Sequence, residues 1–181
     1  IEKVQIIRTI KELFIKASQT NSRTLSKLID EYFIPQQLEK KINSEVSTPY
    51  ELRQDMLNKI PASFFETINK IFEPCCGKGG FIIDIVEKFM IGLKNKIKDK
   101  DQRYKTIVEK CLYFCDINPT NIFICKLLLD SNNEYNLNYY EGSTLELDIT
   151  KDTEMWKGVK EFDAVIGNPP YNDGKNKGAN H

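Results

Sequence analysis

The sequence predicts an α/β fold with a mainly parallel sheet and helices on both faces. Two observations predict it: short apolar runs alternate with helical patterns, and the turns after those runs carry the polar and glycine-rich segments of the chain. Parallel strands joined by helices form right-handed crossovers, and ligands bind at the carboxyl ends of such strands. The 181 residues suffice for one such domain with a sizeable core.

The first quarter of the chain is predicted to be helical. Apolar residues at helical spacing predict one helix over residues 1–20, and a similar pattern predicts another over residues 24–32. We therefore expect residues 1–45 to form a helical region that precedes a domain of residues 46–181.

Thr48 and Pro49 predict the start of the next helix, because proline suits the first turn of a helix. Leu52, Met56 and Ile60 recur at helical spacing and are expected on one face.

The remaining predicted elements alternate between strands and helices. The predicted strands lie at residues 68–72, 111–115, 136–140 and 162–166, and the predicted helices at 81–98 and 119–129. Residues 94–105 are rich in lysine and are expected to form a solvated loop, so the end of the first of these helices is not sharply defined.

Composition limits the classes of protein that need considering. Lys and Arg total 26, as do Asp and Glu, so the net charge gives no indication of nucleic-acid binding. No apolar stretch approaches the roughly 20 residues of a membrane span, and no signal peptide is visible. Five cysteines without a secretory signal predict reduced thiols and a cytoplasmic location. Because the chain starts at Ile1 rather than Met, we expect a piece of a longer protein.

A glycine-rich turn follows the first predicted strand. Its candidate binding residues are Glu73, Pro74, Cys75, Gly77, Gly79 and Phe81. Glycines allow a tight turn and a close approach of ligand to backbone, and the helix that follows offers free N–H groups. The turn lacks the features of a phosphate loop and of a dinucleotide fingerprint. An acidic strand end followed by Pro and Gly-x-Gly suits a cationic ligand with an amino-acid moiety; an ordinary strand–helix turn is the alternative.

Three further residues follow the second and third strands. Asp116 ends the second strand, where a carboxylate can accept both hydroxyls of a ribose. An Asp at a strand end is by itself more often a helix cap or a surface charge, but the place of Asp116 one strand–helix unit after the glycine turn favours the ribose. Ile117 can cover a purine ring, and Ser143 can reach the base of the ligand.

Asn168, Pro169, Pro170 and Tyr171 follow the last predicted strand. The prolines fix the backbone and leave carbonyls without competing local N–H partners. An amide and an aromatic face beside those carbonyls suit a flat ring that bears an amino group. The alternative is a proline-rich turn with no chemistry.

Together these segments resemble the S-adenosylmethionine-dependent N6-adenine DNA methyltransferases over roughly residues 46–175. The resemblance implies a Rossmann-like class I methyltransferase fold. It also implies that the glycine turn binds the methionine part of S-adenosyl-L-methionine, that Asp116 binds its ribose, and that Asn168 to Tyr171 bind a flipped-out adenine. Thr48 and Pro49 match the Thr-Pro element that is typical upstream of the glycine turn.

The motif order resembles the gamma arrangement found in type I modification subunits and fused restriction–methylation enzymes. About 20 residues separate Ser143 from Asp163, too few for a DNA-reading domain. The resemblance therefore implies double-stranded DNA as partner and a recognition domain or specificity subunit outside this chain. The chain departs from the family pattern at Glu73, where Asp is common, at Cys75 and Cys76, where small residues are common, and at Ser143, where many members have Asp.

The implied reaction is direct methyl transfer. Asn168 and the Pro169 carbonyl would accept the N6 hydrogens of adenine, and Tyr171 would stack on the base. Two alternatives remain: a protein glutamine N5-methyltransferase, which also uses Asn-Pro-Pro-Tyr but favours a different glycine turn, and a cofactor-binding fragment that is inactive without its C-terminal part.

Other chemistry-bearing residues are predicted to be structural. Cys111 and Cys115 should face one side of a strand as buried thiols, and no second pair has metal-ligand spacing. Trp156 is predicted to be a packing residue. His181 is the only histidine and lies in the terminal tail, which argues against catalysis by histidine.

Overall fold

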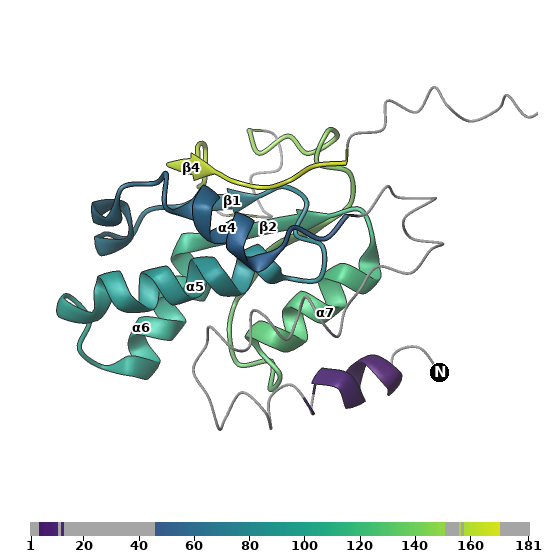
Figure 1. Ribbon diagram of the computed structural model, residues 1–181, viewed down its shortest axis with the longest axis horizontal. Coiled ribbons are helices and arrows are strands. Elements are labelled where there is room, and N and C mark those ends of the chain that lie inside the picture. The colour runs from purple at the N-terminus through teal and green to yellow at the C-terminus, as the bar shows by residue number, and fades with distance from the viewer. Residues whose placement is uncertain (1–3, 11, 13–45, 151–155, 157, 171–181) are drawn as a thin grey trace, which may run out of the picture.

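A parallel four-stranded sheet organises the chain (Figure 1). The computed structural model describes residues 4–10, 12, 46–150, 156 and 158–170. The strands lie in the order β3-β2-β1-β4, and all three neighbouring pairs are parallel. Their bounds are β1 Ile71–Glu73, β2 Leu112–Asp116, β3 Asn138–Glu141 and β4 Ala164–Val165. The predicted α/β fold is confirmed.

The strand order reverses between β1 and β4. The chain runs outward from β1 through β2 to β3 and then crosses back to place β4 on the other side of β1. At such a switch point the loops after the two strands diverge and leave a crevice at their carboxyl ends. The glycine turn follows β1 and Asn168 follows β4, so this topology brings together the two segments that the sequence singled out.

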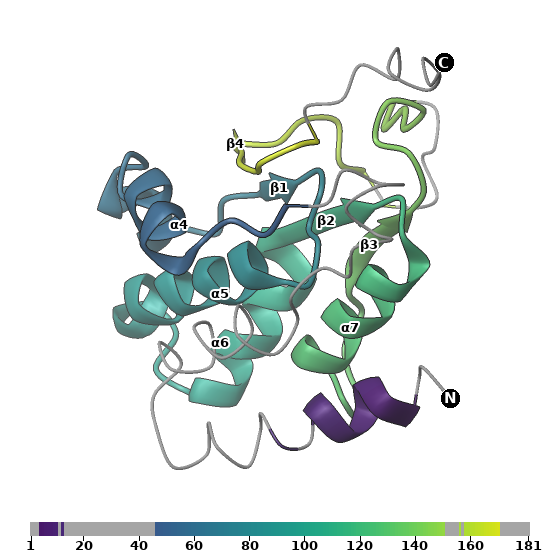
Figure 2. The same ribbon diagram turned by 45° about the vertical axis from the view of Figure 1, so that its right-hand side comes forward.

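Within residues 46–150, four longer helices and three short ones accompany the sheet. They are α4 Tyr50–Leu57, α5 Gly80–Gly92, α6 Lys100–Thr106, α7 Pro119–Leu129, the 3₁₀ turns η1 Ala62–Glu66 and η2 Leu93–Asn95, and the π turn η3 Ile107–Cys111. Residues 4–10 are also helical and lie beside α7 in both ribbon views (Figures 1 and 2). Within the described part of the chain, no helix combines the length and apolar character needed to cross a membrane.

The two faces of the sheet bury different cores because side chains alternate along each strand. Leu112 and Phe114 of β2 face a large aliphatic core that contains residues of α5 and α7. Tyr113 and Cys115 face a smaller core built around Phe72 and Trp156, whose rings pack edge to face at 5.6 Å. Trp156 is thus a packing residue, as predicted. The described residues that pack on this second face, Leu147, Ile149, Val159 and Phe162 among them, lie outside the helices, so helices on this face stay a prediction.

Several predicted boundaries are confirmed. The helix at residues 119–129 is α7, and its start follows from Asn118, whose side chain accepts a hydrogen bond from the Thr120 N–H at 3.0 Å. A helix begins directly after Pro49, as expected, and residues 4–10 are helical. The predicted second helix at residues 24–32 lies outside the described residues.

Other predicted details are wrong. Met56 and Ile60 pack against the aliphatic core, but Leu52 is half exposed. The buried residues of α4 are Tyr50, Arg53 and Leu57, and Arg53 pairs with Asp84 of α5. The first strand begins at Ile71, and the exposed Ile68 precedes it.

The lysine-rich segment is the largest difference from the sequence prediction. Residues 94–105 were expected to form a solvated loop, yet α6 begins at Lys100 and α5 ends at Gly92. Asp99 caps α6 by accepting a hydrogen bond from the Gln102 N–H at 2.7 Å.

Cys111 and Cys115 are both buried free thiols, as predicted, but they do not face the same side. Cys111 belongs to the π turn η3 rather than to β2, so its side chain enters the aliphatic core while that of Cys115 enters the aromatic one.

Candidate active site

The glycine turn between β1 and α5 is anchored on the neighbouring strand. The Cys76 N–H donates to the Cys115 carbonyl at 2.9 Å, and the Gly79 N–H donates back to the Cys76 carbonyl at 3.0 Å. Gly77 and Gly79 adopt φ angles of 52° and 91°, in the left-handed region that favours glycine. The backbone thus needs glycine at both positions irrespective of any ligand.

Glu73, the last residue of β1, is a buried carboxylate with an incomplete set of partners. Its Oε1 accepts the Cys75 N–H at 3.0 Å, whereas its Oε2 has no hydrogen-bond partner among the described residues. Burial raises the pKa of Glu73 to about 8, against the lowering effect of the Cys75 hydrogen bond. A buried acceptor without a partner is rare and indicates a site that a donor can complete.

Asp116, the last residue of β2, joins the turn to the start of α7. Its Oδ2 accepts the Gly77 N–H at 2.8 Å, and its Oδ1 accepts the Asn118 N–H at 2.8 Å and the Asn121 Nδ2 at 3.2 Å. Burial raises the pKa of Asp116, and these hydrogen bonds act in the opposite direction. A carboxylate has about four acceptor positions, so these three bonds leave room for about one ligand hydroxyl. Binding of two ribose hydroxyls would require one protein donor to move.

Ile117 directly follows β2, and Ser143 lies two residues after the end of β3. Ile117 is 65% exposed next to Asp116, which leaves its side chain open to cover a ring. Ser143 is half-buried, and its carbonyl accepts the Glu146 N–H at 3.0 Å. The residue after it makes the contacts to the turn: the Thr144 hydroxyl donates to the Pro74 carbonyl at 2.5 Å and lies 3.0 Å from the Cys115 Sγ.

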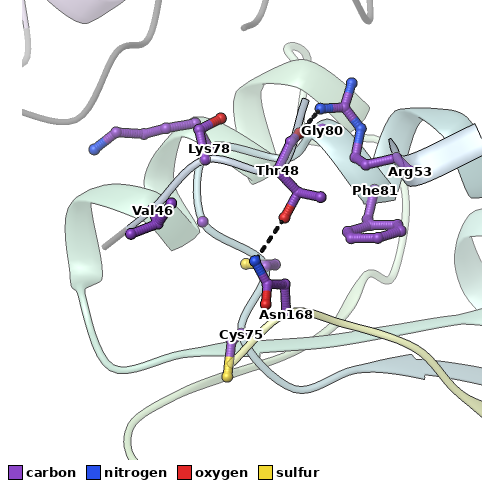
Figure 3. Close-up of a pocket in the computed structure, with 11 residues that line it drawn as sticks. Val46, Thr48, Arg53, Cys75, Lys78, Gly80, Phe81 and Asn168 are labelled. Carbon is purple, nitrogen blue, oxygen red and sulfur yellow. Dashed lines mark hydrogen bonds between the residues drawn. The ribbon is translucent and has the colours of Figure 1, made fainter. Parts of the chain in front are cut away.

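Asn168 connects the end of β4 to the Thr-Pro segment. Its Nδ2 donates to the Thr48 Oγ1 at 3.1 Å across 120 residues of sequence. Figure 3 shows the amide nitrogen toward Thr48 and the amide oxygen on the other side of the group. Pro169 and Pro170 are exposed, and Tyr171 lies outside the described residues.

A pocket lies where the Thr-Pro segment, the glycine turn and Asn168 meet (Figure 3). It is lined by Val46, Ser47, Thr48, Arg53, Cys75, Cys76, Gly77, Lys78, Gly80, Phe81 and Asn168. The structure therefore brings five of the predicted site residues together around one hollow: Thr48, Cys75, Gly77, Phe81 and Asn168. The other described candidates, which do not line it, are Pro49, Glu73, Pro74, Gly79, Asp116, Ile117, Ser143, Pro169 and Pro170.

Residues 21–181 match the family of N-6 DNA methylases. The chain belongs to this family. Membership makes it an adenine-specific DNA methyltransferase, and it implies S-adenosyl-L-methionine as methyl donor and DNA as substrate. A comparison with curated proteins gives no match.

Two side chains of the candidate site, those of Thr144 and Arg53, were not predicted from the sequence. Thr144 reaches Pro74 only through the fold, and no sequence signal marks it. Arg53 lines the pocket from α4 and pairs with Asp84 of α5. A signal for this pair exists: Asp84 is a charged residue inside the apolar run that begins α5, and it requires a buried partner.

Proposed function

We propose that this pocket binds S-adenosyl-L-methionine and that Asn168 and Pro169 hold the target adenine beside it for methylation at N6. The observation that carries the proposal is the hydrogen bond between Asn168 and Thr48. Through this bond Asn168, which is expected to bind the base, lies beside the Thr-Pro segment that lines the pocket together with the glycine turn. One site can then hold both substrates.

The residues at the glycine turn fit the methionine part of the cofactor. Oε2 of Glu73 is a buried acidic oxygen with no hydrogen-bond partner in the part of the chain that the structure describes, which suits the cationic amino group of an amino acid. A Cβ built on Gly77 would meet no atom within 4 Å, so space is open beside the turn backbone. We propose that Glu73, Pro74, Cys75, Gly77, Gly79 and Phe81 form this part of the site together with Thr48 and Pro49.

We propose that the ribose and adenine of the cofactor bind at the carboxyl ends of β2 and β3. We propose that Asp116 accepts a ribose hydroxyl through its remaining acceptor position, and that Ile117 and Ser143 contact the adenine ring of the cofactor. The exposure of Ile117 supports this role, since a ring can cover it without displacing other side chains.

When bound, the cofactor supplies an electrophilic methyl group. The N6 lone pair of adenine is delocalised into the ring and is a poor nucleophile, so the protein must orient it. Asn168 Oδ1 and the Pro169 carbonyl would accept the two N6 hydrogens, which favours a pyramidal nitrogen with its lone pair directed away from the ring. Pro170 has no N–H to compete for these acceptors. Tyr171 is proposed to stack on the extruded base.

Methyl transfer tests this proposal directly. The protein is incubated with cofactor labelled in the methyl group and unmethylated double-stranded DNA, and the digested DNA is analysed by mass spectrometry. We expect the label in N6-methyladenine. A protein with accessible glutamine side chains serves as the rival acceptor. Label in glutamine and none in adenine would contradict the proposal.

We further propose that the enzyme modifies DNA in a restriction–modification system, in the cytoplasm. The gamma-like motif order supports the first part, and the five free cysteines support a reducing compartment. A DNA-recognition domain or specificity subunit outside residues 1–181 would then select the target sequence. DNA from a host that carries the gene should resist cleavage by the cognate endonuclease, whereas DNA from the same host without the gene should be cleaved. Equal resistance would contradict this role.

A further inference from the structure

Arg53 is a buried cation outside every motif that the sequence identified. Its side chain is 2% exposed, and its Nε donates to Asp84 Oδ2 at 2.6 Å, with the Asp84 side chain fully buried. Desolvating two charges costs free energy that a pair of apolar residues would not cost. The ion pair is therefore expected to fix a geometry that apolar packing could not.

The pair fixes α4 against the start of α5. Asp84 lies in the first half of α5, directly after the glycine turn. Gly80 makes room for the guanidinium, because a Cβ at this position would lie 2.8 Å from both Arg53 Cζ and Nη1. Gly80, the last glycine of the turn, leaves space for the Arg53 guanidinium, whereas Gly77 and Gly79 allow the left-handed backbone conformation of the turn.

Arg53 also holds the segment that precedes α4. Its Nη1 donates to the carbonyl of Thr48, while the hydroxyl of the same threonine accepts from Asn168. A planar guanidinium can make both bonds at fixed angles, which a lysine ammonium cannot reproduce. Asp84, Arg53, Thr48 and Asn168 form a continuous series of contacts from α5 to the segment after β4. Figure 3 shows the part of this series from Arg53 through Thr48 to Asn168.

The series determines how the Asn168 amide is oriented. A primary amide has a donor end and an acceptor end, and donation from Nδ2 to Thr48 places Oδ1 at the opposite end. We propose that Arg53 is a positioning residue that holds Thr48 so that the oxygen of Asn168 faces the target adenine. The inference rests on the proposed role of Asn168 as the acceptor for the N6 hydrogens.

The first test measures the orientation of Asn168 without any turnover. The side-chain amide signals of Asn168 are followed by ¹⁵N NMR in the wild-type protein, Arg53→Lys, Thr48→Val and Asp84→Asn. We expect all three variants to shift these signals and speed their solvent exchange. Arg103→Lys is the matched control, because Arg103 is also buried but donates to the Ile97 carbonyl at 2.9 Å. Unchanged Asn168 signals in a folded Arg53→Lys protein would overturn the proposal, whether or not the protein methylates adenine.

The second test uses kinetics on unmethylated DNA. Arg53→Lys and Thr48→Val are each expected to lower kcat by about tenfold, within the loss that a small misplacement of a positioning group produces. In Arg53→Lys the KM for the cofactor should stay within about twofold of the wild-type value, whereas Thr48→Val should also raise it, because Thr48 belongs to the proposed cofactor site. Arg103→Lys should leave kcat unchanged. Arg53→Lys added to Thr48→Val should lower kcat no further, since the first acts through the second. Independent, multiplicative losses would show that Arg53 does not act through Thr48.

Discussion

The two halves of the candidate site are built in different ways. Glu73 and Asp116 end the two central strands, are buried, and are bound by backbone N–H groups of the glycine turn and of the segment before α7. Asn168 follows the two-residue strand β4, and the prolines after it are exposed. The proposed cofactor half is thus pre-organised by the sheet, whereas the proposed target half is open and is joined to the Thr-Pro segment through Thr48.

From this difference we expect cofactor binding and methyl transfer to be separable by substitution. Interactions already formed in the folded protein hold a ligand without further ordering, which favours cofactor affinity. A group that must meet a base extruded from DNA needs an accessible position, and its orientation then depends on a few side-chain contacts. Changes in the target half should therefore reduce the rate of transfer, and changes in the cofactor half should reduce affinity for the cofactor.

The largest effect is expected from Asn168→Ala. Removing the amide oxygen should lower kcat by about 100-fold or more, because a positioned polar contact to the reacting group is lost. Steady-state methylation of unmethylated DNA measures the effect. Asn138→Ala is the matched control, since this asparagine lies at the amino end of β3 and bonds to the carbonyls of Glu109 and Leu112. Near-normal transfer by Asn168→Ala would remove Asn168 from the reaction.

A pH-dependent effect is expected from Glu73→Gln. The folded-state pKa of about 8 lies above the ordinary value of 4.5, so the folded protein retains a proton that the unfolded chain releases. The associated stability is fully present below pH 4.5 and is lost as the pH rises toward 8, with a slope of up to about 1.4 kcal/mol per pH unit. Glu73→Gln should flatten this slope in urea unfolding measured across that window. An unchanged slope would show that Glu73 is ionised in the folded protein.

Gly167→Ala tests whether a change in the target half of the site can affect the cofactor half. Gly167 belongs to the target segment, but a Cβ there would overlap Glu73 Oε1 and lie 3.1 Å from Pro74 Cδ. We expect cofactor affinity to fall by about tenfold, equivalent to about 1.4 kcal/mol, in calorimetric titration. Val165→Ala, at an exposed position of β4, is the control. Equal affinity in Gly167→Ala and wild type would mean that Glu73 can move without loss of binding.

The smallest effect is expected from Thr144→Val. This change keeps the shape of the side chain but removes the hydroxyl that donates to the Pro74 carbonyl and contacts Cys115. The free energy of unfolding should fall by about 1 kcal/mol. Thr150→Val provides a comparison, because the exposed Thr150 bonds locally to Asp148. Equal losses in the two variants would argue against a special role of Thr144 in holding the turn.

The parts of the fold with local sequence signals could be predicted. The limits of α7 were correct because Asn118 caps its start and Pro119 stands in its first turn. Helix α6 was missed because its charged residues are typical of a solvated loop. Its cap, Asp99, was a usable signal, but the burial of Arg103 and Thr106 depends on tertiary packing.

The candidate site could be predicted as a set of motifs but not as a connected arrangement. Each motif lies at the carboxyl end of a strand or at the start of a helix, where sequence patterns are informative. The contacts of Asn168 with Thr48 and of Thr144 with Pro74 join segments 120 and 70 residues apart. No local pattern encodes such pairs. The buried ion pair of Arg53 and Asp84 was likewise hidden because apolar spacing, rather than charge, was used to choose the buried face of α4.

The separation of the two halves is tested most directly by measuring cofactor affinity and single-turnover transfer on the same preparations of Glu73→Gln and Asn168→Ala. We expect Glu73→Gln to bind cofactor more weakly but to transfer the methyl group normally once the cofactor is saturating. We expect Asn168→Ala to bind cofactor like wild type and to transfer at least about 100-fold more slowly. Loss of cofactor binding in Asn168→Ala, or slow transfer by saturated Glu73→Gln, would contradict the proposed separation of the two halves.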